Sequence, residues 1–280
     1  QPIAAVSGDG ALLRVSQNGA ANIVRNSVSS HPGGALTIVA GARIDGGAAL
    51  TLDATGNTSI DASAALSAQA IDANSNLITF LGNGAIAPAG ASGFVIGSDT
   101  LNLLRGAQSV TLRSRGDMNF LGAVRIDLAH DLNLSAGAFA SDGGTVDIEA
   151  GRLGLSNDLG AANGAFTAGG GQFVAHANEV DFGAGNTGLR GFGGFSASAT
   201  QGMHGQGTGR FDFGSLDVNL STPWLLAGDG ADTVHPQLWP SPKWPLAPDA
   251  AIEQRVQQLL QRMTLEEKIQ IAELLDEMGI

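Results

Sequence analysis

The chain has 280 residues, of which 41 are Gly, none is Cys or Tyr, and 14% are charged, with a formal net charge of −12. This composition excludes collagen, because Gly has no three-residue period, and disorder, because disordered chains combine high charge with few apolar residues. The absence of Cys excludes disulfides and Cys-ligated metals, and the negative net charge argues against a nucleic-acid-binding surface. No segment of the sequence approaches the ~20 consecutive apolar residues of a membrane span.

Short apolar–polar–apolar triplets recur through residues 11–220, separated by Gly, Asn, Asp, Ser and Ala. This alternation is typical of a strand with one buried face, and the frequent turn residues indicate that the strands are short. The triplets are Leu36-Thr37-Ile38, Leu50-Thr51-Leu52, Leu101-Asn102-Leu103, Val110-Thr111-Leu112, Leu132-Asn133-Leu134 and Val146-Asp147-Ile148.

The spacing of the apolar residues predicts how the strands are arranged. One series steps by 22, 21, 20 and 22 residues through Val110, Leu132, Leu153, Phe173 and Phe195. A second series steps by about 20–23 residues through Leu101, Val124, Val146 and Phe166. Two interleaved series with one period predict an all-β repeat protein, a solenoid of parallel strands with about 21 residues per coil. A Gly-rich β-sandwich is the alternative.

Three segments resemble the repeats of filamentous-haemagglutinin-type proteins, which are bacterial exoproteins exported by two-partner secretion. They are residues 50–54, 131–137 and 144–151, and the resemblance extends over about residues 10–220. It implies a right-handed parallel β-helix, a secreted or cell-surface location and a non-catalytic role as adhesin or scaffold. The implied partners are an outer-membrane transporter and ligands on host cells or polysaccharide surfaces.

The composition changes near residue 228. Lysine first occurs at Lys243, and six of the nine prolines lie between Pro223 and Pro248. We therefore predict a β-repeat domain over 1–228, a Pro/Trp-rich connector over 229–248 and an amphipathic α-helical tail over 249–280. The tail is predicted from apolar residues at helical spacing and a capping box, and we expect it to begin a hydrolase-like domain or to cap the solenoid. Those residues are Ile252, Val256, Leu259, Leu260 and Met263, and the capping box is 264–267.

Residues 235–270 resemble the amino-terminal lead-in of glycoside hydrolase family 3 β-glucosidases. The matching residues are His235-Pro236, Trp239-Pro240 and Arg262-Met263-Thr264-Leu265-Glu266-Glu267-Lys268-Ile269. The family nucleophile is an Asp in a Ser-Asp-Trp context, which this chain lacks, so no catalytic residue carries over. Because unlike resemblances meet in one chain, a chimeric origin is a further hypothesis.

Two groups of residues are candidates for a functional site. A glycosidase needs two carboxylates across a cleft, and Asp127, Asp131, Asp147, Glu149, Glu179 and Asp181 recur along the strands. We favour the interpretation that they face outward and keep the surface polar. Trp224, Trp239 and Trp244 could stack on sugar rings, although Trp beside Pro more often packs a connector onto a domain.

The pattern predicts no metal site and no cofactor. The five histidines are scattered without an HExxH pair, and the Gly-rich segments lack the Lys of a phosphate-binding loop. The sequence therefore predicts a bacterial adhesin or scaffold. The alternatives are a fragment of a family 3 glycoside hydrolase and a β-helical polysaccharide-degrading enzyme.

Overall fold

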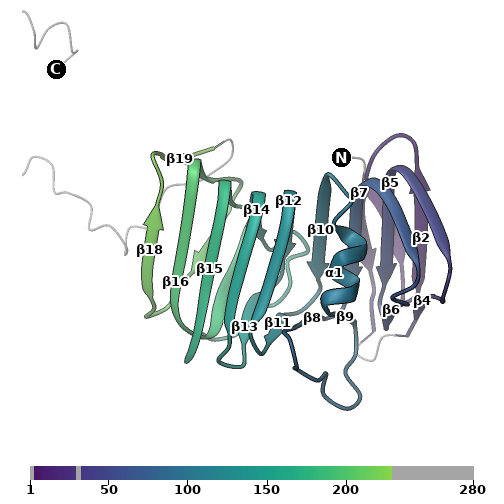
Figure 1. Ribbon diagram of the computed structural model, residues 1–280, viewed down its shortest axis with the longest axis horizontal. Helices are drawn as coiled ribbons and strands as arrows, with labels where there is room; N and C mark the ends of the chain where they lie inside the picture. The colour runs from purple at the N-terminus through teal and green to yellow at the C-terminus, as the bar shows by residue number, and fades with distance from the viewer. Residues whose placement is uncertain (1–2, 30–32, 229–280) are drawn as a thin grey trace, which may run out of the picture. The chain divides into compact units, whose positions relative to one another are not determined.

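The computed structural model describes residues 3–29 and 33–228, all within one compact unit that spans residues 1–233. These residues are mostly β-strand (Figure 1). The elements are β1 (Ile3–Ser7), β2 (Ala11–Ser16), β3 (Asn22–Asn26), β4 (Leu36–Ile38), β5 (Arg43–Ala54), β6 (Thr58–Ile60), β7 (Ala65–Ser75), β8 (Ile78–Leu81), β9 (Phe94–Ile96), α1 (Ser98–Leu104), β10 (Ser109–Ser114), β11 (Met118–Leu121), β12 (Val124–Ser135), β13 (Ala138–Ser141), β14 (Thr145–Ser156), β15 (Thr167–Phe182), β16 (Gly185–Gly205), β17 (Gly209–Asp212), β18 (Asp217–Ser221) and β19 (Leu225–Ala227).

Neighbouring strands are paired mostly in parallel, and part of the predicted register is confirmed. Val110 lies opposite Leu132, and Leu132 lies opposite Leu153, as their spacing predicts. The next step is wrong, because Leu153 pairs with Val180 and not with Phe173, whereas the last step is confirmed, because Phe173 lies opposite Phe195. In Figure 1, β12, β14, β15 and β16 run side by side.

The register changes because the connection between β14 and β15 is longer than the others. Val146 pairs with Phe173, 27 residues later, whereas 22 residues separate Val124 from Val146 and Phe173 from Phe195. The segment 157–166 accounts for the difference, since it forms a turn and an irregular stretch outside the strands. A single period therefore does not describe the strand pairing.

One predicted strand is a helix. The triplet Leu101-Asn102-Leu103 lies in α1, which is bounded by Gly97 and has Asp99 in its first turn. An acidic residue in the first turn favours a helix, because the amides there are unpaired. Leu101 and Leu104 are buried, and their spacing of three residues places them on one face beside β7 and β9.

The predicted fold class is wrong. The large sheet is mixed, because β2 runs antiparallel to β5, and its strands form a nearly closed, barrel-like arrangement. In addition, β1 and β3 form a separate two-stranded sheet. The protein is thus neither a right-handed parallel β-helix nor a solenoid repeat protein. Equal spacing determines which residues lie opposite each other in adjacent strands, but it does not determine how the sheet curves or closes.

The core is formed by the apolar residue of each alternating pair. Leu50, Leu52, Ile71, Val110 and Leu132 are fully or almost fully buried, and they belong to one continuous cluster. Phenylalanines extend the cluster: the ring centroids of Phe80 and Phe120 are 5.1 Å apart, and those of Phe173 and Phe195 are 5.2 Å apart. The intervening polar residues consequently point to the opposite face of the sheet.

The predicted connector 229–248 and α-helical tail 249–280 lie outside the described residues. The same is true of the segment that resembles family 3 glycoside hydrolases. These predictions stay predictions.

Candidate ligand-binding groove

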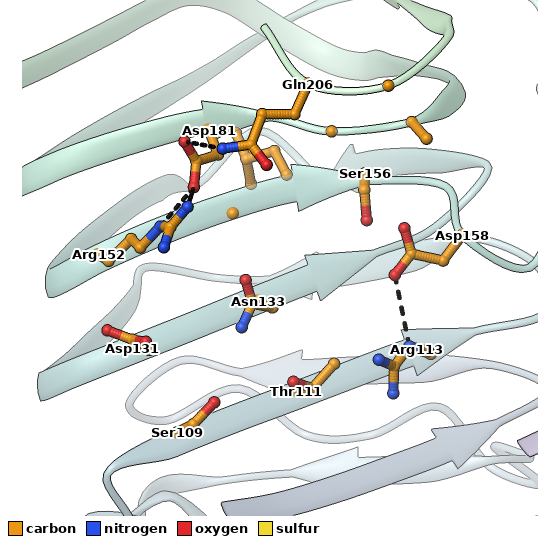
Figure 2. Close-up of a pocket in the computed structure, with 15 residues that line it drawn as sticks. Ser109, Thr111, Arg113, Asp131, Asn133, Arg152, Ser156, Asp158, Asp181 and Gln206 are labelled. Atoms are coloured by element: carbon orange, nitrogen blue, oxygen red, sulfur yellow. Dashed lines mark hydrogen bonds and ion pairs between the residues drawn. The ribbon is translucent and has the colours of Figure 1, made fainter. Parts of the chain in front are cut away.

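An open groove of about 470 Å³ lies on the polar face of β10, β12, β14 and β15 (Figure 2). Side chains alternate between the two faces of a strand. In β12, Leu132 and Leu134 therefore lie in the core, whereas Asp131 and Asn133 line the groove. The same alternation that forms the core thus produces the groove.

The parallel register aligns the groove residues in two rows that cross the strands. Each strand contributes one residue to a row, so residues about 21 to 27 positions apart become neighbours. The rows are Ser109–Asp131–Arg152 and Thr111–Asn133–Gly154–Asp181. The remaining lining residues are Arg113, Leu155, Ser156, Asp158, Gly183, Ala184, Gln206 and Gly207.

One end of the groove is organised around the carboxylate of Asp181. Arg152 Nε lies 2.5 Å from Asp181 Oδ2. On the other oxygen, Gln206 Nε2 donates a hydrogen bond of 3.0 Å, and His204 Nδ1 lies 3.2 Å away. Hydrogen bonding to Asp181 raises the pKa of the Arg152 guanidinium, which therefore stays charged. This network holds the side chains at this end in one orientation.

The other end is formed by Arg113, which lies between two carboxylates. Its Nη1 is 3.5 Å from Asp72 Oδ1, and its Nε is 3.5 Å from Asp158 Oδ2. Asp72 is buried on the neighbouring strand β7, and burial raises the pKa of its carboxyl group. Asp158 is on the loop after β14, where its backbone amide donates a 2.8 Å hydrogen bond to Ser135 Oγ.

The middle of the groove carries unpaired polar groups. Within residues 3–29 and 33–228, no group forms a hydrogen bond with the side chain of Asn133, Asp131 or Ser156. Gly154 leaves room for the Asn133 amide, since a Cβ on Gly154 would lie 2.4 Å from Asn133 Oδ1. The centre thus offers an amide, a carboxylate and a hydroxyl between two charged ends.

The polar face continues beyond Arg113, where it is buried. In the next strands, the residues in register with Thr111 and Arg113 are Asp72 and Asn74 of β7 and Thr51 and Asp53 of β5. Asp53 is completely buried and is paired with Arg25 of β3 and with Arg115. This part of the face is closed to solvent, so the groove begins at β10.

The predicted carboxylates divide between two places. Asp131 and Asp181 line the groove, and Glu179 Oε2 lies 3.6 Å from Arg152 Nε. Asp147 and Glu149 lie elsewhere, on the solvent-facing side of β14, where both pair with Arg125. They alternate with the buried Val146 and Ile148, as predicted for outward-facing residues.

Asp127 belongs to this second group and acts electrostatically on Arg125. The pKa of Arg125 is raised by the nearby Asp147 carboxylate. This exposed cluster has charge partners but does not line the groove.

Of the three tryptophans, only Trp224 is described. Its side chain is 63% exposed, and its carbonyl accepts a 2.8 Å hydrogen bond from the Met203 amide. Trp224 does not line the groove. Trp239 and Trp244 lie outside the described residues.

Sequence reasoning did not single out Asn133, Arg113 or Arg152. The available signal was the polar residue at the centre of each triplet, because Thr111 and Asn133 recur at the same spacing as their apolar neighbours.

In the part of the chain that the structure describes, no group of three or more His, Asp or Glu residues is placed to hold a metal ion. The same part contains no helix with the length and apolar character of a membrane span.

Comparison with known proteins adds no relative: no family model, curated protein or solved structure matches this chain.

Proposed function

We propose that this chain is a non-catalytic binding module that holds a glycan in the groove of β10, β12, β14 and β15. The observation that carries the proposal is the distribution of polar groups in the groove. Charged groups at its two ends are held by partners, whereas the groups at its centre have no hydrogen-bond partner among the described residues, and one of them, Asp131, acts electrostatically on Arg152. Sugars present many hydroxyls that donate and accept, and such ligands match amides, carboxylates and hydroxyls on a fixed frame.

In this proposal Asn133 is the central contact, because its amide offers two donors and one acceptor. Asp131 and Ser156 add an acceptor and a hydroxyl on either side. Arg152 is already oriented by Asp181, so little side-chain entropy is lost when it contacts a ligand. The ligand would therefore bind a site that is formed before it arrives.

We further propose that the module belongs to a bacterial adhesin or scaffold that is secreted or displayed at the cell surface. The support is the resemblance of residues 10–220 to exported haemagglutinin-type repeats, together with a polar sheet face suited to surface glycans. Its partners would be host-cell or polysaccharide ligands and an outer-membrane transporter. Fractionation of cells that express the protein tests the location, and recovery from the cytoplasm alone would refute it.

A glycan panel tests the binding proposal. We expect the wild-type protein to retain at least one glycan, and Asn133→Ala and Arg152→Ala to weaken that binding at least about tenfold, the equivalent of one or two hydrogen bonds. The matched controls are Asn178→Ala and Arg125→Ala, which change the same residue types on a surface outside the groove. Equal loss in the controls, or no retention of any glycan, would refute the proposal.

Polysaccharide cleavage is the competing function, because Asp131, Asp158 and Asp181 all line the groove. Two of them, Asp158 and Asp181, already pair with the guanidinium groups of Arg113 and Arg152. A general acid must carry a proton that it can donate to the substrate, whereas a neighbouring guanidinium favours the charged form of a carboxylate. Release of reducing sugar that is lost in Asp131→Asn and Asp181→Asn would replace the binding proposal with hydrolysis.

A further inference from the structure

We propose that copies of this chain associate head to tail, with β18 of one copy pairing with β2 of the next. Within residues 3–29 and 33–228, β2 pairs with β5 alone and β18 pairs with β16 alone. The two strands lie at opposite ends of the large sheet in Figure 1. A strand with one unpaired edge can accept another strand, so each end can form an interface. The proposal goes beyond the glycan groove and does not depend on it.

At the β18 end, core positions are open to solvent. Val218 lies opposite Phe195, and Leu220 lies opposite Ala197. Phe195 and Ala197 are buried, whereas the side chains of Val218 and Leu220 are 41% and 36% exposed. Because residues opposite each other in paired strands share one face of the sheet, Val218 and Leu220 are core positions that no further strand covers among the described residues. The exposed apolar residues that follow are Trp224, Leu225 and Leu226.

The β2 end has the same property. Leu13 lies opposite Leu52, and Val15 lies opposite Leu50. Leu50 and Leu52 are buried, whereas the side chains of Leu13 and Val15 are 47% and 53% exposed. Single exposed apolar residues are ordinary, but a group of them marks an interaction surface. Each end of the sheet thus presents two core-facing apolar side chains with one residue between them.

The two ends fit each other in strand direction and in spacing. From β5 to β18 the successive strands run parallel, whereas β2 runs antiparallel to β5. A second copy that continues the sheet beyond β18 therefore presents its β2 in the antiparallel direction. When Val218 lies opposite Val15 of the second copy, Leu220 lies opposite Leu13. The two apolar pairs then continue the core from one copy into the next.

The charges of the two strands favour the same pairing. β2 contains one charged residue, Arg14, and β18 contains one, Asp217. In the arrangement above, Asp217 is diagonal to Arg14 of the second copy, and diagonal neighbours are within reach of long side chains. Arg14 donates hydrogen bonds to two uncharged groups, the Gly19 carbonyl and Ser16 Oγ, and acts electrostatically on Asp72. An exposed ion pair of this kind fixes orientation more than it adds affinity.

Pairing between like ends is less favourable. Two β2 strands whose apolar residues meet would place Arg14 directly opposite Arg14 of the second copy, and like charges in that position destabilise a sheet. Two β18 strands would place Asp217 opposite Ser221, so no opposite charges would meet. The head-to-tail arrangement is therefore favoured. Because such an interface joins two different surfaces, copies can add one after another.

Two single substitutions test this arrangement in sedimentation experiments on the full chain. Leu13→Arg places a charge at the β2 end, and Leu220→Arg places one at the β18 end. The mass of the wild type should rise with concentration between about 10 μM and about 1 mM, since interfaces this small bind weakly. Each variant alone should stay monomeric. An equimolar mixture should form dimers and nothing larger, because each variant keeps the end that the other lacks.

Ile86→Arg is the matched control. Ile86 is 88% exposed in the connection between β8 and β9, so this variant should associate as the wild type does. Urea denaturation shows whether each variant is folded. Should Leu220→Arg fail to fold, Val218→Arg takes its place. Should Leu13→Arg fail to fold, Val15→Arg takes its place.

Three results would overturn the proposal. A wild type that stays monomeric at every concentration would mean that no second copy occupies these ends. Dimers of either variant alone would mean that like ends pair. A mixture of the two variants that stays monomeric, or an equal loss of association in Ile86→Arg, would mean that β2 and β18 do not form the interface.

Discussion

Arg25 in β3 and Asp53 in β5 form a buried ion pair that joins two sheets. Arg25 Nε lies 2.5 Å from Asp53 Oδ2, and the two side chains are 2% and 0% exposed. Arg25 also donates a 3.0 Å hydrogen bond to the Gly8 carbonyl, and the second Asp53 oxygen pairs with Arg115. Because β3 pairs with β1 in the two-stranded sheet, whereas β5 lies in the large sheet, this ion pair holds the small sheet against the large one.

Removal of Arg25 should destabilise the protein strongly. In Arg25→Met the apolar stem is kept, but Asp53 loses one of its two positive partners while it remains buried. Removing one partner of a buried ion pair typically lowers the free energy of unfolding by about 3–5 kcal/mol. Urea denaturation followed by circular dichroism measures this change.

The exposed Arg125 provides the control for that variant. Arg125 also pairs with two acidic residues, Asp147 and Glu149, but its side chain is 58% exposed. Solvent screens such pairs, so Arg125→Met should lower the free energy of unfolding far less than Arg25→Met does. If the two substitutions lowered the free energy of unfolding equally, the inference that burial of Asp53 makes the loss of Arg25 costly would be wrong.

Phe120 should be among the most sensitive core positions. Its ring stacks on Phe80 at 5.1 Å and meets the edge of Phe173 at 6.3 Å, and its side chain is fully buried. Phe120→Ala should therefore lower the free energy of unfolding by about 3–5 kcal/mol. The partly buried Phe211 is the comparison, and Phe211→Ala should cost clearly less in the same urea titration. A larger loss at Phe211 would contradict the assignment of the core.

Local features of the fold could be predicted from the sequence. The alternation in Val146-Asp147-Ile148 indicated which side chains are buried, and equal spacing predicted that Val124 lies opposite Val146 in the neighbouring strand. Both predictions depend only on strand geometry. Side chains alternate between the two faces of a strand, and residues at equal spacing along the chain lie opposite each other in neighbouring parallel strands. The antiparallel β2–β5 pair could not be predicted in this way, since chain direction leaves no mark on the alternation of residues.

The groove could be predicted only in part. Thr111 and Asn133 occupy the polar position of their triplets, so their place on one outer face follows from spacing. The pairing of Arg152 with Asp181 could not be anticipated, because it depends on the longer connection 157–166, which shifts β15 relative to β14. The position of Asp158 depends on the conformation of the same connection.

Gly154 should be important for binding but not for stability. A Cβ at this position would lie 2.4 Å from Asn133 Oδ1, the end of a flexible side chain that can rotate away. Gly154→Ala should therefore change the free energy of unfolding by less than about 1 kcal/mol, a typical value for a substitution without a buried clash. It should weaken glycan binding, because the Asn133 amide leaves the centre of the groove. The glycan panel and urea denaturation measure the two effects on one sample.

Gly144 is the contrasting glycine. A Cβ there would lie 2.1 Å from the backbone carbonyl oxygen of Gly122, which cannot move without distorting the chain. Gly144→Ala should lower stability by about 1–3 kcal/mol, as other overpacking substitutions do. If Gly154→Ala proved the more destabilising of the two, Asn133 would be more rigid than the groove proposal requires.

Asp72 should make the stability of the protein depend on pH. Burial raises its pKa above the ordinary value of 3.8, so the folded state binds a proton more tightly than the unfolded state. The slope of the unfolding free energy against pH is proportional to the number of protons bound by the unfolded state minus the number bound by the folded state. Because the folded state binds more protons at Asp72, the slope is negative for this group. Its contribution is fully present below the unfolded pKa and is lost as pH rises through the folded pKa.

Asp72→Asn removes this titration while it keeps a polar side chain of similar size. The unfolding free energy of wild type minus that of Asp72→Asn should decrease as pH rises from about 3.8 to neutrality, and it should be constant below that range. Urea denaturation in a series of buffers measures both proteins, and Asp61→Asn, a fully exposed carboxyl, serves as the comparison. The pKa of Asp61 is lowered by its hydrogen bond with Ser63, so its contribution changes in the opposite direction, being lost as pH falls. The opposite result would be a difference between the two free energies of unfolding, wild type minus Asp72→Asn, that increases with pH. It would mean that Arg113 and Thr111 stabilise the charged form of Asp72 more than burial disfavours it.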